Sequence, residues 1–268
     1  MALQLKSTGK LMLKGINLLV YGQAGAGKTS LIATLPNPIV LSAEGGLLSI
    51  QDADLPYLEI DGMSTLMEAY SWLKESAEAQ AYQSVALDSI SEIAEVVLNA
   101  EKKATKDPRA AYGNMQEQMA DIIRAFRDLP GRHVYMSAKL EKTQDEMGRV
   151  LYSPSMPGNK TGQALPYFFD EVLALRIEKD AEGVIQRGLM CDSDSLWLAK
   201  DRSGKLDAHL LGKPFPVPRG QHFSQEADEG QRSGTEGQQS GKHHPSMGVT
   251  ENSSFEPTLY GPTVLMGF

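Results

Sequence analysis

The sequence predicts an α/β fold with a mostly parallel sheet flanked by helices and with antiparallel strands at its C-terminal edge. From Gly15 to about Leu211, apolar runs alternate with amphipathic stretches, which is the pattern of a layered α/β domain. A glycine-rich stretch separates the first apolar run from the first amphipathic one. The last apolar runs follow one another closely, in an order typical of hairpins at the end of a sheet.

Each element follows from its own pattern. The first apolar run, INLLVYG, reads as a strand, and a helix is expected to start near Lys28 after the glycines. Further strands are expected at 38–45, 84–90, 133–140, 170–178, 188–193 and 196–201. Amphipathic periodicity predicts helices at 64–80, 90–103 and 115–129.

The composition favours a cytosolic globular protein. With 268 residues, of which 41% are hydrophobic, the chain can build a sizeable core. The single cysteine, Cys191, excludes an intrachain disulfide and a multi-cysteine zinc site. No apolar run approaches the roughly 20 residues that span a bilayer, so no membrane partner is expected. The formal net charge of -8 gives no global positive field, so any contact with nucleic acid must come from local basic segments.

The chain is expected to divide at about Pro218. Residues 1–218 form the predicted core, and residues 219–268 are rich in Gly, Ser, Gln and Glu and read as a disordered polar tail. The tail ends in TVLMGF, which is apolar enough to dock on a partner; an idle terminus is the alternative.

The glycine-rich stretch matches the phosphate-loop pattern G-x-x-x-x-G-K-[ST] and lies between a strand and a helix, as that pattern requires. Backbone N–H groups would wrap the phosphates, Lys28 would reach the β- and γ-phosphates, and the Thr29 hydroxyl would ligate Mg²⁺. We therefore expect ATP with Mg²⁺ as the cofactors. The expected nucleotide-binding residues are Gly22, Gln23, Ala24, Gly25, Ala26, Gly27, Lys28, Thr29 and Ser30.

Two carboxylates at strand ends are candidates for the same site. Asp88 ends the apolar run SVALD and could hold the metal opposite Thr29; a turn aspartate is the alternative. Glu44 follows the strand after the loop, and ligands of open parallel sheets bind at the carboxyl ends of strands. Glu44 is therefore predicted to orient the attacking water, although a surface glutamate before Gly45 is the alternative reading.

This order of motifs resembles the RecA-like P-loop ATPases. The closest likeness is to the short phage proteins that contain little more than a RecA core and act in recombination or single-strand annealing, described as nucleotide-binding, AAA-type ATP-binding proteins. The segments VLSAEGGL, VALDSI and GQALPYFFDEVLALRIEKD carry the resemblance, which covers roughly Gly15 to Leu206. It implies a RecA-like P-loop NTPase core and a homo-oligomer, either a ring or a short filament.

The stretch LWLAKDRSGKL resembles the strand-end cations of RecA-like recombinases and DnaB-type helicases. The resemblance implies that Lys200 and Arg202 reach the γ-phosphate bound by a neighbouring subunit, which would stabilise charge on the transferred phosphoryl group. Solvated charges beside the Ser203-Gly204 turn are the alternative. The chain departs from the family where a glutamine senses the γ-phosphate, because it has Lys139 there.

Two segments correspond in position to the family's DNA-binding loops. They are 101–113 (EKKATKDPRAAYG) and the long polar stretch 141–163; solvated loops are the alternative. Their cations would contact phosphates, and an aromatic side chain would stack on a base. The candidate DNA-binding residues are Lys102, Lys103, Lys106, Arg109, Tyr112, Lys142, Arg149 and Lys160.

The sequence as a whole predicts an ATP-hydrolysing protein that acts on single-stranded DNA in phage-type recombination, annealing or repair, in the host cytoplasm, with a single-strand DNA-binding protein as a possible partner. Three alternatives stay open. A DnaB-like helicase or translocase would use the same core. A small-molecule kinase would need a lid with several arginines, and 141–163 has one. A nucleotide-dependent adaptor would use the tail to recruit a partner.

Overall fold

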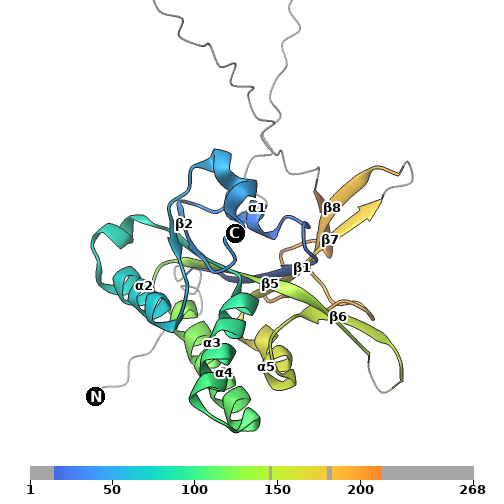
Figure 1. Cartoon of the computed structure of the whole chain (residues 1–268). Helices are drawn as coiled ribbons and strands as arrows, with labels where there is room; N and C mark the ends of the chain where they lie inside the picture. The colour runs from blue at the N-terminus through green and yellow to red at the C-terminus, as the bar shows by residue number, and fades with distance from the viewer. Residues whose placement is uncertain (1–14, 145–146, 180–182, 213–268) are drawn as a thin grey trace, which may run out of the picture.

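One mixed sheet organises the molecule (Figure 1). The computed structural model describes residues 15–144, 147–179 and 183–212. Within these ranges the strand order is β10-β8-β7-β1-β5-β4-β2-β3, with β6 paired to β5 and β9 paired to β7. The strands are β1 Asn17–Gly22, β2 Pro38–Ser42, β3 Tyr57–Glu59, β4 Ser84–Asp88, β5 His133–Gln144, β6 Val150–Pro154, β7 Glu171–Lys179, β8 Ile185–Met190, β9 Lys200–Asp201 and β10 His209–Gly212.

The strands from β7 through β3 in this order are all parallel to their neighbours. Strands β8, β9 and β10 pair antiparallel at the edge near the end of the described chain, and β6 folds back antiparallel on β5. The predicted fold class is therefore confirmed, since the sheet is mostly parallel with antiparallel strands at one edge.

Helices cover both faces of the sheet (Figure 1). Helix α1 (Lys28–Ile32) and the 3-10 helix η2 (Leu47–Ala53) lie on one face. Helices α2 (Met63–Glu75), α3 (Ile90–Ala104) and α4 (Pro108–Arg127) lie on the other. The remaining short helices are η3 (Glu78–Ala81), α5 (Asn159–Ala164) and η4 (Leu165–Phe168).

The core consists of two layers separated by the sheet. Leu19 and Tyr21 of β1 belong to the layer under α2, α3 and α4, whereas Leu18 and Val20 belong to the layer under α1. This alternation follows from the two-residue period of a strand. Because β1 and the first half of β5 are central and buried on both faces, they read as mostly apolar runs in the sequence.

Several predicted boundaries were wrong, including those of the last strands, where β8 covers 185–190 instead of 188–193 and β9 only 200–201 instead of 196–201. Strand β2 ends at Ser42, so Glu44 lies in the turn after it. The helix expected at 64–80 ends at Glu75 and is followed by η3. The helix expected from 115 begins at Pro108, because the Asp107 side chain accepts a hydrogen bond from the N–H of Arg109 (2.9 Å) and proline suits the first helical position. Strands β3, β6 and β10 were not predicted.

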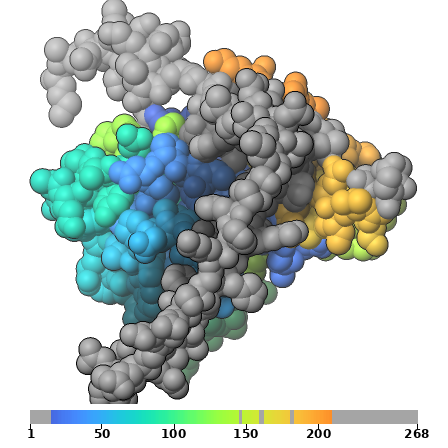
Figure 2. All heavy atoms as spheres, turned by 90° about the horizontal axis from the view of Figure 1, so that it is seen from above, coloured from blue at the N-terminus to red at the C-terminus, as the bar shows by residue number. Residues whose placement is uncertain are grey.

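Seen from above, the C-terminal edge strands form the yellow and orange side of the molecule, and the first half of the chain forms the blue-to-green side (Figure 2). Within the described ranges, none of the helices combines the length and the hydrophobicity that a membrane-spanning helix requires. The tail predicted at 219–268 lies outside the described residues and stays a prediction.

Candidate functional site

The phosphate loop joins the end of β1 to the start of α1. A Cβ on Gly22 would lie 2.6 Å from the carbonyl oxygen of Leu175 on β7, so the loop can leave the sheet here only with glycine. Gly25 and Gly27 have φ angles of 74° and 106°, which side chains other than glycine rarely adopt. These glycine conformations let the backbone turn tightly between β1 and α1, so that N–H groups of the segment from Gly22 to Ser30 can face a bound phosphate.

Lys28 is held over this loop. Its Nζ donates to the carbonyl oxygens of Gly22 (2.9 Å) and Gln23 (3.2 Å). Burial lowers the pKa of Lys28, and the nearby carboxylates of Glu44 and Asp88 oppose that shift. A partly desolvated ammonium group at the mouth of the loop is a favourable partner for a phosphate.

Tyr135 holds the backbone of the same lysine in place. Its hydroxyl donates to the carbonyl oxygen of Lys28 at 2.7 Å, across the interior of the domain. Burial, together with the Asp88 carboxylate, raises the pKa of Tyr135 well above its ordinary value, so the hydroxyl keeps the proton that it donates. The start of α1 is thereby tied to β5.

Thr29 and Asp88, which were predicted to hold the metal from opposite sides, are in direct contact. The Thr29 hydroxyl donates to Oδ2 of Asp88 at 2.7 Å, and Ser137 donates to Oδ1 of the same carboxylate. Asp88 and Ser137 come together because β4 and β5 are parallel neighbours in which Leu87 is in register with Met136. A hydroxyl and a carboxylate oxygen in contact beside a phosphate loop are hard oxygen ligands, and they fit Mg²⁺.

Glu44 lies beside this pair, in the turn after β2. Its Oε1 accepts a hydrogen bond from the hydroxyl of Ser89, the residue that caps α3. Lys139 Nζ approaches the same oxygen to 3.9 Å and forms a shorter ion pair with Glu92 (2.5 Å). The Glu44 carboxylate is therefore oriented by α3 and β5 while more than a third of its side chain stays exposed.

A second cation reaches the loop from the C-terminal edge. Arg187 of β8 donates from Nε to the carbonyl oxygen of Ala26 at 3.0 Å. Its side chain also packs on Gly27, where a Cβ would lie 3.6 Å from Cδ and Nε of Arg187. Among the described residues, Lys28 and Arg187 thus contact the loop from two different elements.

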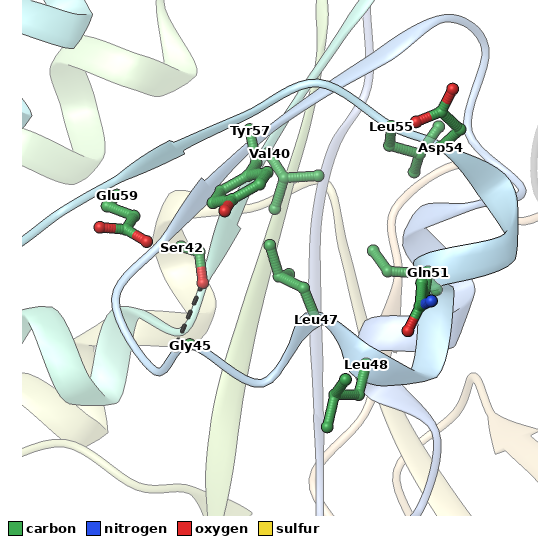
Figure 3. Close-up of a pocket in the computed structure, with 11 residues that line it drawn as sticks. Val40, Ser42, Gly45, Leu47, Leu48, Gln51, Asp54, Leu55, Tyr57 and Glu59 are labelled. Carbon is green, nitrogen blue, oxygen red and sulfur yellow. Dashed lines mark hydrogen bonds between the residues drawn. The ribbon is translucent and has the colours of Figure 1, made fainter.

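A cavity of about 410 Å³ adjoins the turn that carries Glu44 (Figure 3). It lies between η2 and the paired strands β2 and β3, and its lining includes Val40, Leu47 and Tyr57 with the polar side chains of Ser42 and Gln51. The Ser42 hydroxyl accepts the N–H of Gly45 at 3.3 Å and holds the turn at the cavity's edge. This volume and mostly apolar lining are typical of small-molecule sites.

Lys200 and Arg202 lie away from the loop of their own chain. Strand β9 pairs with the start of β7, which is in register with the start of β1, whereas the loop follows the end of β1. Lys200 Nζ donates to the carbonyl oxygens of Pro166 and Phe169 at 2.6 Å each, and Arg202 pairs with Asp170 at 2.8 Å. Their role in a neighbouring site stays a prediction. It would require Lys200 to break its hydrogen bonds to the carbonyl oxygens of Pro166 and Phe169.

The first predicted DNA-binding segment is a helical corner, not a loop. Lys102 and Lys103 end α3, Lys106 lies in the turn, and Arg109 and Tyr112 begin α4. Lys102 Nζ lies 5.3 Å from the centre of the Tyr112 ring. One face of that ring is therefore already covered by a cation, and only its remaining surface is available for stacking.

The second segment is mainly a hairpin rather than one long loop. Lys142 lies on β5, Arg149 precedes β6, and Lys160 lies within α5. The first residues of this polar stretch belong to β5, and residues 140–144 of β5 pair antiparallel with residues 150–154 of β6. A Cβ on Gly158 would lie 3.4 Å from Cδ1 of Tyr112, so the two predicted DNA-binding segments touch.

Four residues of the site were not predicted from the sequence. Ser89 directly follows Asp88, and Ser137 lies two residues before Lys139. Their closeness in the chain to residues already singled out was the available sequence signal. For Tyr135 and Arg187, only the register of the strands in the sheet places the side chain at the loop. The four are Ser89, Tyr135, Ser137 and Arg187.

Comparison with known proteins adds a family match. A protein-family model described as an AAA domain matches residues 14–203. The match covers the phosphate loop, both carboxylates and all strands from β1 to β9. No curated protein matches the sequence.

Proposed function

The chain belongs to the AAA domain family, and from this premise we propose that it couples ATP hydrolysis to the binding of single-stranded DNA in phage-type recombination, annealing or repair. The family implies a nucleotide-binding P-loop ATPase, and domains of this kind generally use ATP and Mg²⁺. The DNA-directed role is the finer part of the proposal.

The residues at the loop suit hydrolysis. The loop N–H groups and Lys28 would bind the phosphates, and Thr29 with Asp88 would hold Mg²⁺, which neutralises phosphate charge. Glu44 has one oxygen fixed by Ser89, which leaves the other to accept a hydrogen bond from water. That water attacks the γ-phosphorus, the bond from the γ-phosphorus to the ADP oxygen breaks, and the water proton passes to Glu44.

One observation carries the proposed coupling to DNA. Helix α3 begins at the nucleotide site, where Ser89 and Glu92 contact Glu44 and Lys139, and it ends in Lys102 and Lys103. A 15-residue helix spans roughly 22 Å, so one rigid element links the two places. Any shift of α3 caused by DNA at its C-terminal end is expected to move the group that orients Glu44.

ATP hydrolysis at low salt tests the proposal, measured with no DNA, single-stranded DNA or duplex, with Lys28→Ala as the blank. We expect stimulation by single strands that disappears as salt is added. Hydrolysis indifferent to DNA contradicts the coupling. Transfer of phosphate to a small molecule would instead identify a kinase, and binding without hydrolysis an adaptor.

A matched pair of variants tests the DNA surface. Lys102 and Lys74 both lie in the last turn of a helix and over a tyrosine ring, at 5.3 Å and 5.9 Å respectively. If Lys102 contacts a phosphate, Lys102→Ala makes the negative slope of log affinity against log salt concentration shallower by about 0.7, the value for one contact to a single strand. Lys74→Ala keeps the wild-type slope. Equal slopes in both variants would remove Lys102 from the interface.

The proposed homo-oligomer is tested with mixed subunits. Arg202→Ala and Lys28→Ala subunits are each expected to be inactive alone if Arg202 completes a neighbour's site. Their mixture should recover part of the activity, because one type of interface then has both groups intact. No recovery in mixtures that co-assemble would exclude the role in trans.

A further inference from the structure

Arg187 connects the C-terminal hairpin to the phosphate loop. It lies on β8, which is separated from β1 by β7 in the sheet (Figure 1). Nε of Arg187 donates to the carbonyl oxygen of Ala26, and a Cβ placed on Gly27 would lie 3.6 Å from Cδ and Nε of Arg187. Ala26 and Gly27 belong to the part of the loop that directly precedes Lys28.

No carboxylate among the residues that the structure describes forms an ion pair with Arg187, and the side chain of Arg187 is half-buried. Arg176 on the adjacent strand differs, because it pairs with Glu178 at 2.9 Å and lies over the Trp197 ring at 5.1 Å. A guanidinium group partly withdrawn from water is stabilised when an anion lies next to it.

The guanidinium geometry favours one kind of anion. A guanidinium group carries five N–H donors in a planar fork, and Nε is engaged by the Ala26 carbonyl. The two terminal nitrogens carry four further donors, and a fork of this shape matches the oxygens of a phosphate. The loop against which Arg187 packs is where nucleotide phosphates are expected.

We propose that Arg187 is a phosphate-binding residue that acts on the nucleotide in its own chain. The fork contacts a phosphate oxygen with its terminal nitrogens while Nε keeps the Ala26 carbonyl in place. Lys28 and Arg187 then bind the phosphates of one nucleotide together. The inference rests on the proposed nucleotide binding at this loop, and it differs from the role predicted for Lys200 and Arg202, which would act on a neighbouring subunit.

Titration of the full chain with a fluorescent ADP analogue and Mg²⁺ tests the proposal. We expect Arg187→Gln to raise Kd about tenfold or more, because a hydrogen bond between charged groups is lost while glutamine can still donate to Ala26. Arg187→Lys should raise Kd less, since it keeps the charge and loses the fork. Lys179→Gln, which removes a positive charge from the end of β7 next to the hairpin turn, should bind as wild type.

The outcomes separate this inference from the proposed function. Wild-type Kd in Arg187→Gln, with binding abolished in Lys28→Ala, overturns the role of Arg187 and leaves the nucleotide site intact. No binding by the wild-type chain overturns the nucleotide site itself. If Arg187→Gln does not fold, Arg187→Lys decides: a raised Kd at unchanged thermal stability supports the fork, and a wild-type Kd overturns it.

Discussion

Ser137→Ala is expected to weaken both the fold and the proposed metal site. Ser137 is fully buried and donates to Asp88, whose carboxylate is 4% exposed. A hydrogen bond to a charged group contributes about 2 kcal/mol, and losing it should lower the Tm by roughly 4–8 °C in a domain of this size. Because Asp88 then loses one of the two groups that orient it, the Mg²⁺ concentration for half-maximal hydrolysis should rise about tenfold or more.

Ser84→Ala is the matched control. Ser84 is also fully buried in the sheet, at the start of β4, and donates to the neutral carbonyl of Pro36 at 2.8 Å. It should lose about 1 kcal/mol of stability and keep the wild-type Mg²⁺ dependence, since it lies at the other end of the strand from Asp88. The same Mg²⁺ dependence in both variants would refute the reasoning that Ser137 positions a metal ligand.

Three further predictions concern the water-orienting group, a buried acid and a loop glycine. Glu44→Gln should lower turnover on the order of a hundredfold or more while ATP still binds, since the amide can accept from Ser89 but cannot take a proton; unchanged turnover would remove Glu44 from the mechanism. Burial and a hydrogen bond to Asp201 raise the pKa of Glu171 from 4.5 to about 8. Between these pH values the unfolded chain has released a proton that the folded chain retains, so Glu171 makes the free energy of unfolding fall as pH rises. Thermal scans from pH 5 to 8 should show a smaller decrease for Glu171→Gln, and identical slopes would contradict this assignment. Gly158→Ala should lower the Tm, because φ is +83° and the new Cβ would lie 2.6 Å from Gln116 Nε2; a wild-type Tm would show that this contact relaxes freely.

The sequence was sufficient for the parts of the site that depend on local pattern and sheet order. The phosphate loop combines glycines, Lys28 and Thr29 in one short stretch between a strand and a helix. Asp88 could be placed because carboxyl ends of parallel strands meet at one edge. That rule places Thr29 and Asp88, 59 residues apart, at the same edge of the sheet, whereas their direct hydrogen bond was not predicted.

Contacts that depend on register between distant elements could not be predicted in this way. Arg187 lies 161 residues from Ala26, and only the placement of β8 two strands from β1 brings it to the loop. The corner after α3 was misread for a different reason. Its polar, lysine-rich composition suggested a loop, although Asp107 followed by Pro108 is a helix-start signal.

This corner constrains how DNA could act on hydrolysis in the proposed function. A loop could couple the two sites by becoming ordered on DNA, but the segment is already a capped helical corner in contact with Gly158. Ser91 of α3 donates to the carbonyl of Ser155 and accepts the N–H of Lys139, so α3 is tied to the start of the β5–β6 hairpin near the nucleotide site. Coupling is therefore expected to require displacement of α3 together with this hairpin. The Glu44 contact to Ser89 is the bond that such a displacement would change, because Glu44 lies in the turn after β2 and on neither of the moving elements.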